Sequence, residues 1–201
     1  MKLNKFFKKK KNFQIKSLFP NFKIKNNFKI NDVNTLHKSQ KNDLTFFDSI
    51  KYKSFAENTK ASACITTLKL EKYLPDRINK IIVKNVLFEL AKILDKIYLN
   101  AEKDYPDLTL RKPSKNIYRG VKFCNNVLIG KNVKIGKNTI IGANAIIEHD
   151  VVIGSNCIIG SNVILKNSII GNNVVVQDSC KIGQKGFGFI PIKNNNFKFP
   201  H

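Results

Sequence analysis

The sequence predicts a left-handed parallel β-helix that follows a small α/β domain, and three observations indicate the helix. In the second half of the chain an apolar residue recurs every six residues, Gly often follows it, and Asn usually lies three positions after it. A fixed period of six is typical of stacked solenoids, in which three hexads make one triangular coil. The lead positions are Ile117, Phe123, Ile129, Ile135, Ile141, Ile147, Ile153, Ile159, Leu165, Ile170, Val176 and Ile182.

Each position of the hexad has an expected role. Lead residues at one corner should stack on one another and fill a narrow interior. Gly and Asn belong at the corners, because they reach backbone conformations that cost bulkier residues more. Between Leu165 and Ile170 the spacing drops to five, which makes this step the place where the register can shift. A small inward slot four residues after a lead is expected to hold Val121, Val127, Val133, Ala145, Val151 and Cys157.

Ahead of the solenoid the pattern indicates alternating strands and helices. Short runs rich in β-branched or aromatic residues predict strands at 44–47, 61–67 and 80–84. A polar helical stretch spans 49–58, and Asn85 can cap a clearer helix with one apolar face. That face is expected to comprise Leu87, Leu90, Ala91, Leu94, Ile97 and Tyr98.

These patterns divide the 201 residues into four parts. A polar stretch with two prolines reads as the linker. We expect a basic N-terminal segment at 1–30, a small α/β domain at 31–99, the linker at 100–116, and a β-helix at 117–201 that is incomplete at its C-terminal end.

The net charge of +22 comes mostly from lysine, since only Arg77, Arg111 and Arg119 are arginines. A basic N-terminus of this kind could hold an acidic protein or an anionic membrane surface, although solvated lysines account for it equally well. Nucleic-acid binding is not expected, because arginine forks and a recognisable binding module are both lacking. The sequence shows neither an apolar run of membrane-spanning length nor a secretory signal, so we expect a cytoplasmic protein.

Cysteine and histidine give weak indications of chemistry. Cys64, Cys124, Cys157 and Cys180 lack the paired spacing of metal or redox sites, and the last two fall in the small inward slot, so no metal site is expected. His37 lies in a polar stretch and His201 ends the chain. His149 has Asp150 beside it and could serve as a base, but adjacent strand residues point to opposite faces. The glycines of 183–188 lack the following helix of a dinucleotide site.

Three blocks resemble the UDP-3-O-acylglucosamine N-acyltransferases of lipid A biosynthesis. They are LTFFDSIKY at 44–52, the strand and helix order from ASACITT to KIIVKNVLFELAKILD, and the hexads that end in GFGF at 186–189. The resemblance covers nearly everything after residue 40, and its specificity rests on the first and third blocks, since many acyltransferases share hexads.

The resemblance implies transfer of a 3-hydroxyacyl chain from acyl carrier protein to the 2-amino group of UDP-3-O-acylglucosamine. No cofactor is implied beyond the phosphopantetheine that carries the acyl chain. The family's solenoids form homotrimers with active sites at subunit interfaces, so a homotrimer is implied for the complete protein. Its small front domain implies a uridine site.

Site residues follow from the same resemblance. The family's aromatic pair around the uracil ring corresponds to Phe46 and Tyr52, and its sugar-binding Asn corresponds to Ser49, whose side chain is shorter. The family's catalytic His is expected beyond residue 201, so no catalytic residue is assigned and the chain as given is expected to be an inactive N-terminal fragment. Two alternatives stay open: another hexapeptide-repeat nucleotide-sugar acetyltransferase, or a non-catalytic solenoid that binds a partner.

Overall fold

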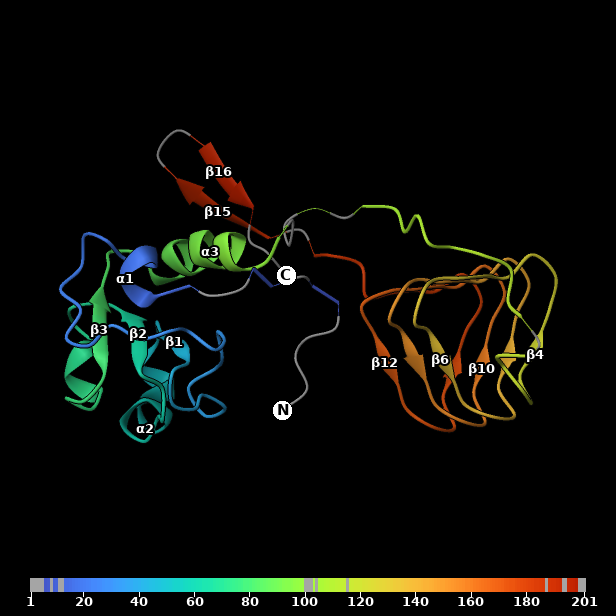
Figure 1. Ribbon diagram of the computed structural model, residues 1–201, viewed down its shortest axis with the longest axis horizontal. Helices are drawn as coiled ribbons and strands as arrows, with labels where there is room; N and C mark the ends of the chain where they lie inside the picture. The colour runs from blue at the N-terminus through green and yellow to red at the C-terminus, as the bar shows by residue number, and fades with distance from the viewer. Residues whose placement is uncertain are drawn as a thin grey trace. The chain divides into compact units, whose positions relative to one another are not determined.

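The computed structural model describes residues 6–7, 9–10, 13–99, 103, 105–114, 116–186, 188–192 and 195–198 (Figure 1). Contacts divide the chain into two compact units. One comprises Met1–Phe6 and Asp104–Gly186, and the other comprises Phe7–Lys103 and Phe187–His201. No helix among the described residues is long and apolar enough to cross a membrane.

A three-stranded parallel sheet organises the second of these, the α/β unit. Its strands are β1 (Leu44–Phe47), β2 (Ala63–Thr66) and β3 (Asn79–Ile82), in the order β1-β2-β3. All three lie where the sequence predicted strands. The side chains alternate across the sheet: Leu44, Ile65 and Ile81 join the apolar cluster with helix α3 (Val86–Ile97), whereas Phe47 and Cys64 join a cluster on the other face.

Short helices complete the unit. They are α1 (Ile15–Leu18), the 3-10 helices η1 (Ile50–Tyr52) and η2 (Glu71–Tyr73), and α2 (Lys53–Glu57). The predicted cap of α3 is confirmed, because the Asn85 side chain accepts a hydrogen bond from the Phe88 backbone N at 3.0 Å.

The buried stripe of α3 differs in part from the expectation. Leu87 was expected in the core but is 41% exposed, while Ile93 is buried. The stripe runs instead through Val86, Leu90, Ile93 and Ile97, a spacing of four, three and four that keeps these side chains on one side of the helix.

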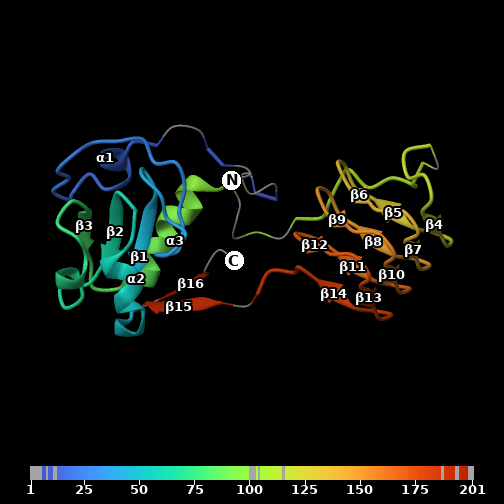
Figure 2. The ribbon, with the colours of Figure 1, turned by 90° about the horizontal axis from the view of Figure 1, so that it is seen from below.

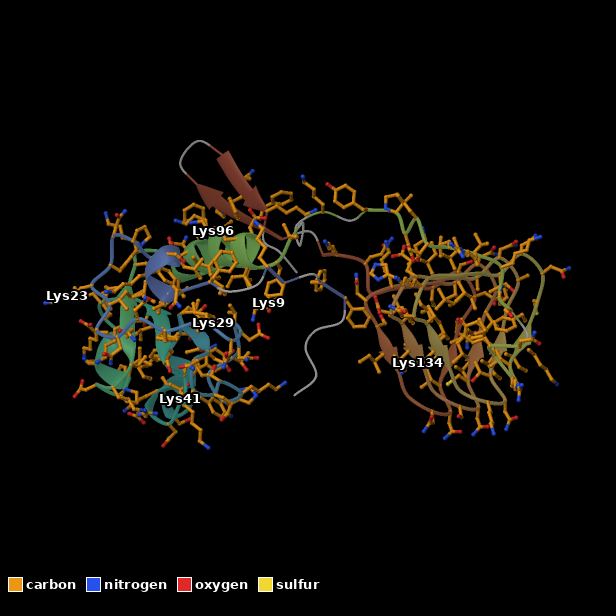
Figure 3. The ribbon with its side chains drawn as sticks, in the orientation of Figure 1. Lys9, Lys23, Lys29, Lys41, Lys96 and Lys134 are labelled. Atoms are coloured by element: carbon orange, nitrogen blue, oxygen red, sulfur yellow. The ribbon has the colours of Figure 1, made fainter. Side chains whose placement is uncertain are left out.

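The basic N-terminal segment contributes to the core of the α/β unit. Ile15, Leu18 and Phe19 are buried, and the Ile15 backbone N donates to the Phe28 carbonyl at 2.9 Å. Lysines of this segment labelled in Figure 3, such as Lys9 and Lys23, lie on different sides of this unit. The apolar residues therefore anchor the segment, and its lysines are spread around the unit.

The other unit is a parallel β-helix of eleven two-residue strands (Figure 2). They form three sheets, ordered β13-β10-β7-β4, β14-β11-β8-β5 and β12-β9-β6. The expected fold class, a small α/β domain followed by a hexapeptide-repeat solenoid, is confirmed. The strands are β4 (Lys122–Phe123), β5 (Leu128–Ile129), β6 (Lys134–Ile135), β7 (Ile140–Ile141), β8 (Ile146–Ile147), β9 (Val152–Ile153), β10 (Ile158–Ile159), β11 (Ile164–Leu165), β12 (Ile169–Ile170), β13 (Val175–Val176) and β14 (Lys181–Ile182).

Each strand ends on a predicted lead residue, and the interior follows the predicted register. Leads from Ile129 to Val176 pack in one apolar cluster together with the small inward residues, among them the fully buried Ala145, Val151 and Cys157. The first lead is wrong: Ile117 is 73% exposed and lies outside any strand. Tyr118 packs against the cluster in its place, so the solenoid begins one hexad later than predicted.

Asn and Gly serve the corners for different reasons. Asn126, Asn132 and the corresponding asparagines have φ near +60°, as predicted. Among the repeat glycines only Gly183, with φ +80°, adopts that conformation within the described residues. A Cβ added to Gly142 would lie 2.5 Å from the Gly160 carbonyl carbon of the next coil, so close approach between coils explains glycine there.

The five-residue step leaves the strand pairing intact. Ile140 pairs with Ile158, eighteen residues on, whereas Val152 pairs with Ile169, seventeen residues on. The corner between Leu165 and Ile169 is therefore one residue shorter, and both neighbouring strands keep their inward side.

Beyond the last solenoid strand the chain forms an antiparallel hairpin of β15 (Phe189–Ile192) and β16 (Asn195–Lys198). The hairpin groups with the α/β unit, where the Phe197 ring meets the Phe88 ring of α3 edge to face, with centroids 5.4 Å apart. Phe189 of this hairpin is half exposed. Phe187 and His201 lie outside the described residues.

Candidate functional site

A pocket of about 380 Å³ opens on the α/β unit, where β1 ends and the chain turns into η1 and α2. Both aromatic residues expected at a uridine site line it. The full lining is Thr35, Leu36, His37, Phe46, Asp48, Tyr52 and Phe55.

The strand and the following turn position the two aromatic side chains. Phe46 pairs with Ile65 in the sheet and packs partly against the cluster on the α3 face, so its ring is held by the core while it borders the pocket. Tyr52 ends η1 and is 50% exposed, which leaves its ring and hydroxyl accessible. The structure thus brings the pair into one pocket; that they bind uridine stays a prediction.

Five residues of the lining were not identified from the sequence as binding residues: Thr35, Leu36, His37, Asp48 and Phe55. The Phe55 ring lies 5.5 Å from the His37 ring, centroid to centroid, and Thr35 Oγ1 lies 3.4 Å from His37 Nδ1. Aromatic faces beside a hydroxyl and a carboxylate suit a planar base, which stacks on the rings and donates or accepts hydrogen bonds at its edge. His37 and Phe55 are eighteen residues apart, so no local sequence pattern predicts that their rings lie together.

Ser49 has a structural contact. Its hydroxyl accepts from the Lys51 backbone N at 3.4 Å and caps η1. The sugar contact that the family resemblance implies for Ser49 remains a prediction.

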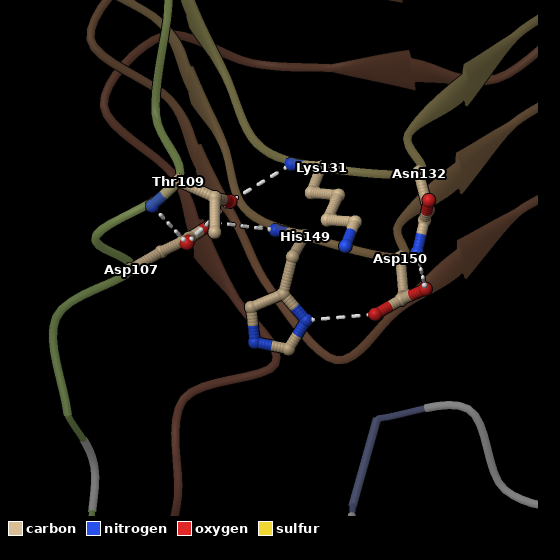
Figure 4. Close-up of polar contacts among 6 residues, drawn as sticks. All are labelled: Asp107, Thr109, Lys131, Asn132, His149 and Asp150. Carbon is tan, nitrogen blue, oxygen red and sulfur yellow. Dashed lines mark hydrogen bonds and ion pairs between the residues drawn. The ribbon is translucent and has the colours of Figure 1, made fainter.

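A second polar cluster lies at a corner of the solenoid (Figure 4). His149 Nδ1 lies 2.9 Å from Asp150 Oδ2, and Asn132 Nδ2 donates to the other Asp150 oxygen at 3.2 Å. The sequence argument against this pair was wrong. Asp150 has φ +62° and leaves the extended conformation, so the side chains of two successive residues converge.

Asp107 fastens the preceding segment to this corner. Its Oδ2 accepts from the His149 backbone N at 2.7 Å, and its Oδ1 accepts from the backbone N of Thr109 at 2.8 Å and from Thr109 Oγ1 at 2.7 Å. Burial raises the pKa of Asp107, but the hydrogen bonds from Thr109 and His149 outweigh it and hold that pKa below its usual value. The side chain reaches His149 because Gly130 has no Cβ, which would collide with both.

No group of three or more His, Cys, Asp and Glu that could hold a metal occurs among the described residues. Cys64 is buried, and burial raises the pKa of its thiol, which keeps it unreactive. Cys157 is buried as expected, whereas Cys180 is only half-buried and Cys124 is exposed.

Each of the two units contains residues that match a known family model. Residues 27–96 match the family model described as UDP-3-O-(3-hydroxymyristoyl) glucosamine N-acyltransferase, LpxD. Residues 132–167 match the model for the bacterial transferase hexapeptide (six repeats). The chain is 35% identical over 84 residues to the UDP-3-O-acylglucosamine N-acyltransferase of Rickettsia bellii (strain RML369-C). That alignment covers 42% of this chain and 24% of the relative, so the chain matches about a quarter of the relative's length.

Proposed function

We propose that this chain, whose residues 27–96 match the family model of a UDP-3-O-acylglucosamine N-acyltransferase, serves N-acylation of UDP-3-O-acylglucosamine in lipid A biosynthesis. The observation that carries the proposal is the pocket of Phe46 and Tyr52, because it lies inside the matched residues and offers aromatic faces to a base. We assign this pocket to the uridine moiety of the acceptor.

The donor in this proposal is a 3-hydroxyacyl chain on acyl carrier protein. A net charge of +22 supports an acidic, thioester-bearing partner, because a basic surface attracts it and raises the association rate. The same lysines would also favour peripheral contact between the protein and an anionic membrane.

A homotrimer is supported by two outward apolar rows on the solenoid. The sheet of β4, β7, β10 and β13 exposes Ile140, Ile158 and Val175. The sheet of β5, β8, β11 and β14 carries half-buried Leu128 and Ile146 at the corresponding outward positions. Two different apolar faces on one subunit suit a ring in which one face packs on the other face of the next copy.

Calorimetric titration of the full chain with UDP-N-acetylglucosamine tests the nucleotide assignment. We expect a Kd between about 1 μM and 1 mM, as for a single shallow site. Phe46→Leu keeps the apolar volume that the core needs and removes the stacking face, which should cost about 1–3 kcal/mol and raise the Kd roughly five- to 150-fold.

Tyr52→Phe should weaken binding through loss of the hydroxyl. Tyr73→Phe is its matched control, because Tyr73 lies on the same unit and packs in the cluster of Phe47 instead of lining the pocket. Unchanged affinity in both Phe46→Leu and Tyr52→Phe, with normal melting temperatures, would refute the assignment of this pocket.

A further inference from the structure

A second pocket of the α/β unit, of about 390 Å³, lies at the edge of the sheet where the strands begin. Its cations come from three segments that each lead into a strand: Lys41 lies just before β1, Lys60 before β2 and Arg77 before β3. Because the three strands are parallel, their starting ends share one edge of the sheet, and the three segments meet there. The pocket of Phe46 and Tyr52 opens where β1 ends, and the two pockets share no lining residue.

The lining of this second pocket carries positive charge and no carboxylate. None of its three cations forms an ion pair with a residue that the structure describes, whereas Lys53, Lys80 and Lys92 of the same unit pair with carboxylates. Like charges around one pocket repel one another, so a bound anion would stabilise the folded unit. The full lining is Gln40, Lys41, Lys60, Ala61, Ser62 and Arg77.

Hydrogen bonds to neighbouring groups position two of the donors. Arg77 Nη2 donates to the carbonyl of Thr59, a buried residue whose hydroxyl donates to the Leu36 carbonyl at 2.9 Å. That bond uses one N–H of the guanidinium and leaves the rest for a ligand. The Ser62 hydroxyl accepts from the Asn42 backbone N at 2.8 Å, so its own hydrogen remains available as a donor.

The two carboxylates nearest to the lining in sequence have other partners. Asp43 is buried, and its Oδ2 accepts from Asn34 Nδ2 and from the Gln40 backbone N, both at 2.9 Å. The Asp76 carboxylate pairs with Lys80 Nζ at 3.4 Å. Neither aspartate lines the pocket, so an anionic ligand would meet donors without competition from a carboxylate of the lining.

We propose that this pocket binds a phosphoryl group with about two negative charges at neutral pH, as in a phosphate monoester or inorganic pyrophosphate. The planar fork of the Arg77 guanidinium matches two phosphoryl oxygens, while the two ammonium groups act as point charges and the Ser62 hydroxyl adds a donor. A small phosphate in solution and the monoester headgroup of a lipid both present this group. The inference is independent of the proposed function, because it uses none of the residues assigned to the uridine.

Calorimetric titration of the full chain with inorganic pyrophosphate, at an ionic strength of about 0.15 M, tests the site. We expect a Kd below about 1 mM for the unaltered chain. Lys60→Ala should raise the Kd about tenfold, because it removes one charge-assisted contact. Arg77→Lys keeps the charge and loses the fork, so it should weaken binding as well.

Lys69→Ala is the matched control for Lys60→Ala. Both lysines are exposed and both variants lower the net charge equally, but Lys60 lies before β2 and Lys69 lies after it. Lys69→Ala should therefore leave the Kd for pyrophosphate unchanged.

Sedimentation of the chain with lipid vesicles separates the two sources of the phosphoryl group. Phosphatidic acid carries a phosphate monoester and phosphatidylglycerol carries a diester, so vesicles of the two lipids are matched for surface charge. Pyrophosphate binding that depends on Lys60 supports a soluble ligand. Binding to phosphatidic acid that depends on Lys60, with weaker binding to phosphatidylglycerol, supports a lipid headgroup.

Other results would overturn the inference. Equal weakening by Lys60→Ala and Lys69→Ala would show only general attraction to a chain of net charge +22. Weaker pyrophosphate binding in Tyr52→Phe would place the anion in the other pocket. No binding of the unaltered chain to either pyrophosphate or phosphatidic acid vesicles would leave the pocket without the proposed ligand.

Discussion

Ile158 and Ile159 offer a direct test of the solenoid register. They are successive residues of β10, which pairs with β7 on one side and β13 on the other. Ile159 is 1% exposed and Ile158 is 48% exposed. The same change, Ile→Ala, can therefore be made on the inner and the outer side of one strand.

The expected free energies of unfolding follow from these environments. Ile159 stacks between Ile141 and Val176, both buried, so Ile159→Ala removes transfer free energy and leaves a cavity that its neighbours cannot fill. The loss should be about 2–5 kcal/mol. Ile158→Ala leaves no cavity and loses only part of the burial free energy of an isoleucine, about 1 kcal/mol.

Urea unfolding followed by circular dichroism, at low micromolar protein, measures both losses. Equal losses for the two variants, or a larger loss for Ile158→Ala, would refute the register. The proposed trimer adds a further expectation. If a second copy covers the outward row, the loss at Ile158 should grow as the protein concentration is raised, because the residue is then buried in the assembly.

Two further predictions concern the corners of the solenoid. Gly142→Ala should lower the melting temperature strongly, because its Cβ would lie 2.5 Å from backbone atoms of the next coil. Gly171→Ala should be neutral or slightly stabilising, because nothing lies within 4 Å of a Cβ at that position. Equal melting temperatures for the two variants would contradict the close approach of coils. Folding lowers the pKa of Asp107 from its ordinary value of 3.8, so its carboxylate stabilises the folded state above that value and the contribution disappears as the pH falls through the lower, folded-state pKa. Asp107→Asn should therefore reduce the fall in melting temperature between about pH 5 and pH 2, and an unchanged pH profile would speak against the role of its hydrogen bonds.

The sequence predicted the solenoid well because its signal is local and repeated. An apolar lead every six residues can be satisfied by few structures, and each solenoid strand from Lys122–Phe123 to Lys181–Ile182 ends on a predicted lead. Prediction failed at the first coil, where Ile117 keeps the period but has no strand beside it and Tyr118 fills the interior. Periodicity does not reveal where stacking begins, since that depends on the neighbouring coil.

The candidate sites depended more on tertiary structure. Phe46 and Tyr52 were identified by their resemblance to a family, and the structure adds Phe55 and His37 to their pocket through chain segments far apart in sequence. The pair of His149 and Asp150 was discounted on strand alternation. That rule holds only in extended backbone, and it does not apply at Asp150, because this residue has a positive φ. The same hexad period that places Asn at the other corners could have signalled this conformation.

Because Ile15, Leu18 and Phe19 are buried, the folded core of the α/β unit begins earlier in the chain than the residues that match the family model. The family match begins at residue 27, after these side chains. A recombinant domain cut at that residue would lose three core side chains together with the hydrogen bond between Ile15 and Phe28, and would leave open the apolar surface they cover on α3 and the sheet. If such a piece expressed weakly, loss of the N-terminal segment would explain it, and the result would not show that the α/β unit is unstable. In this protein the residues that match the family model are therefore fewer than the residues that share one hydrophobic core.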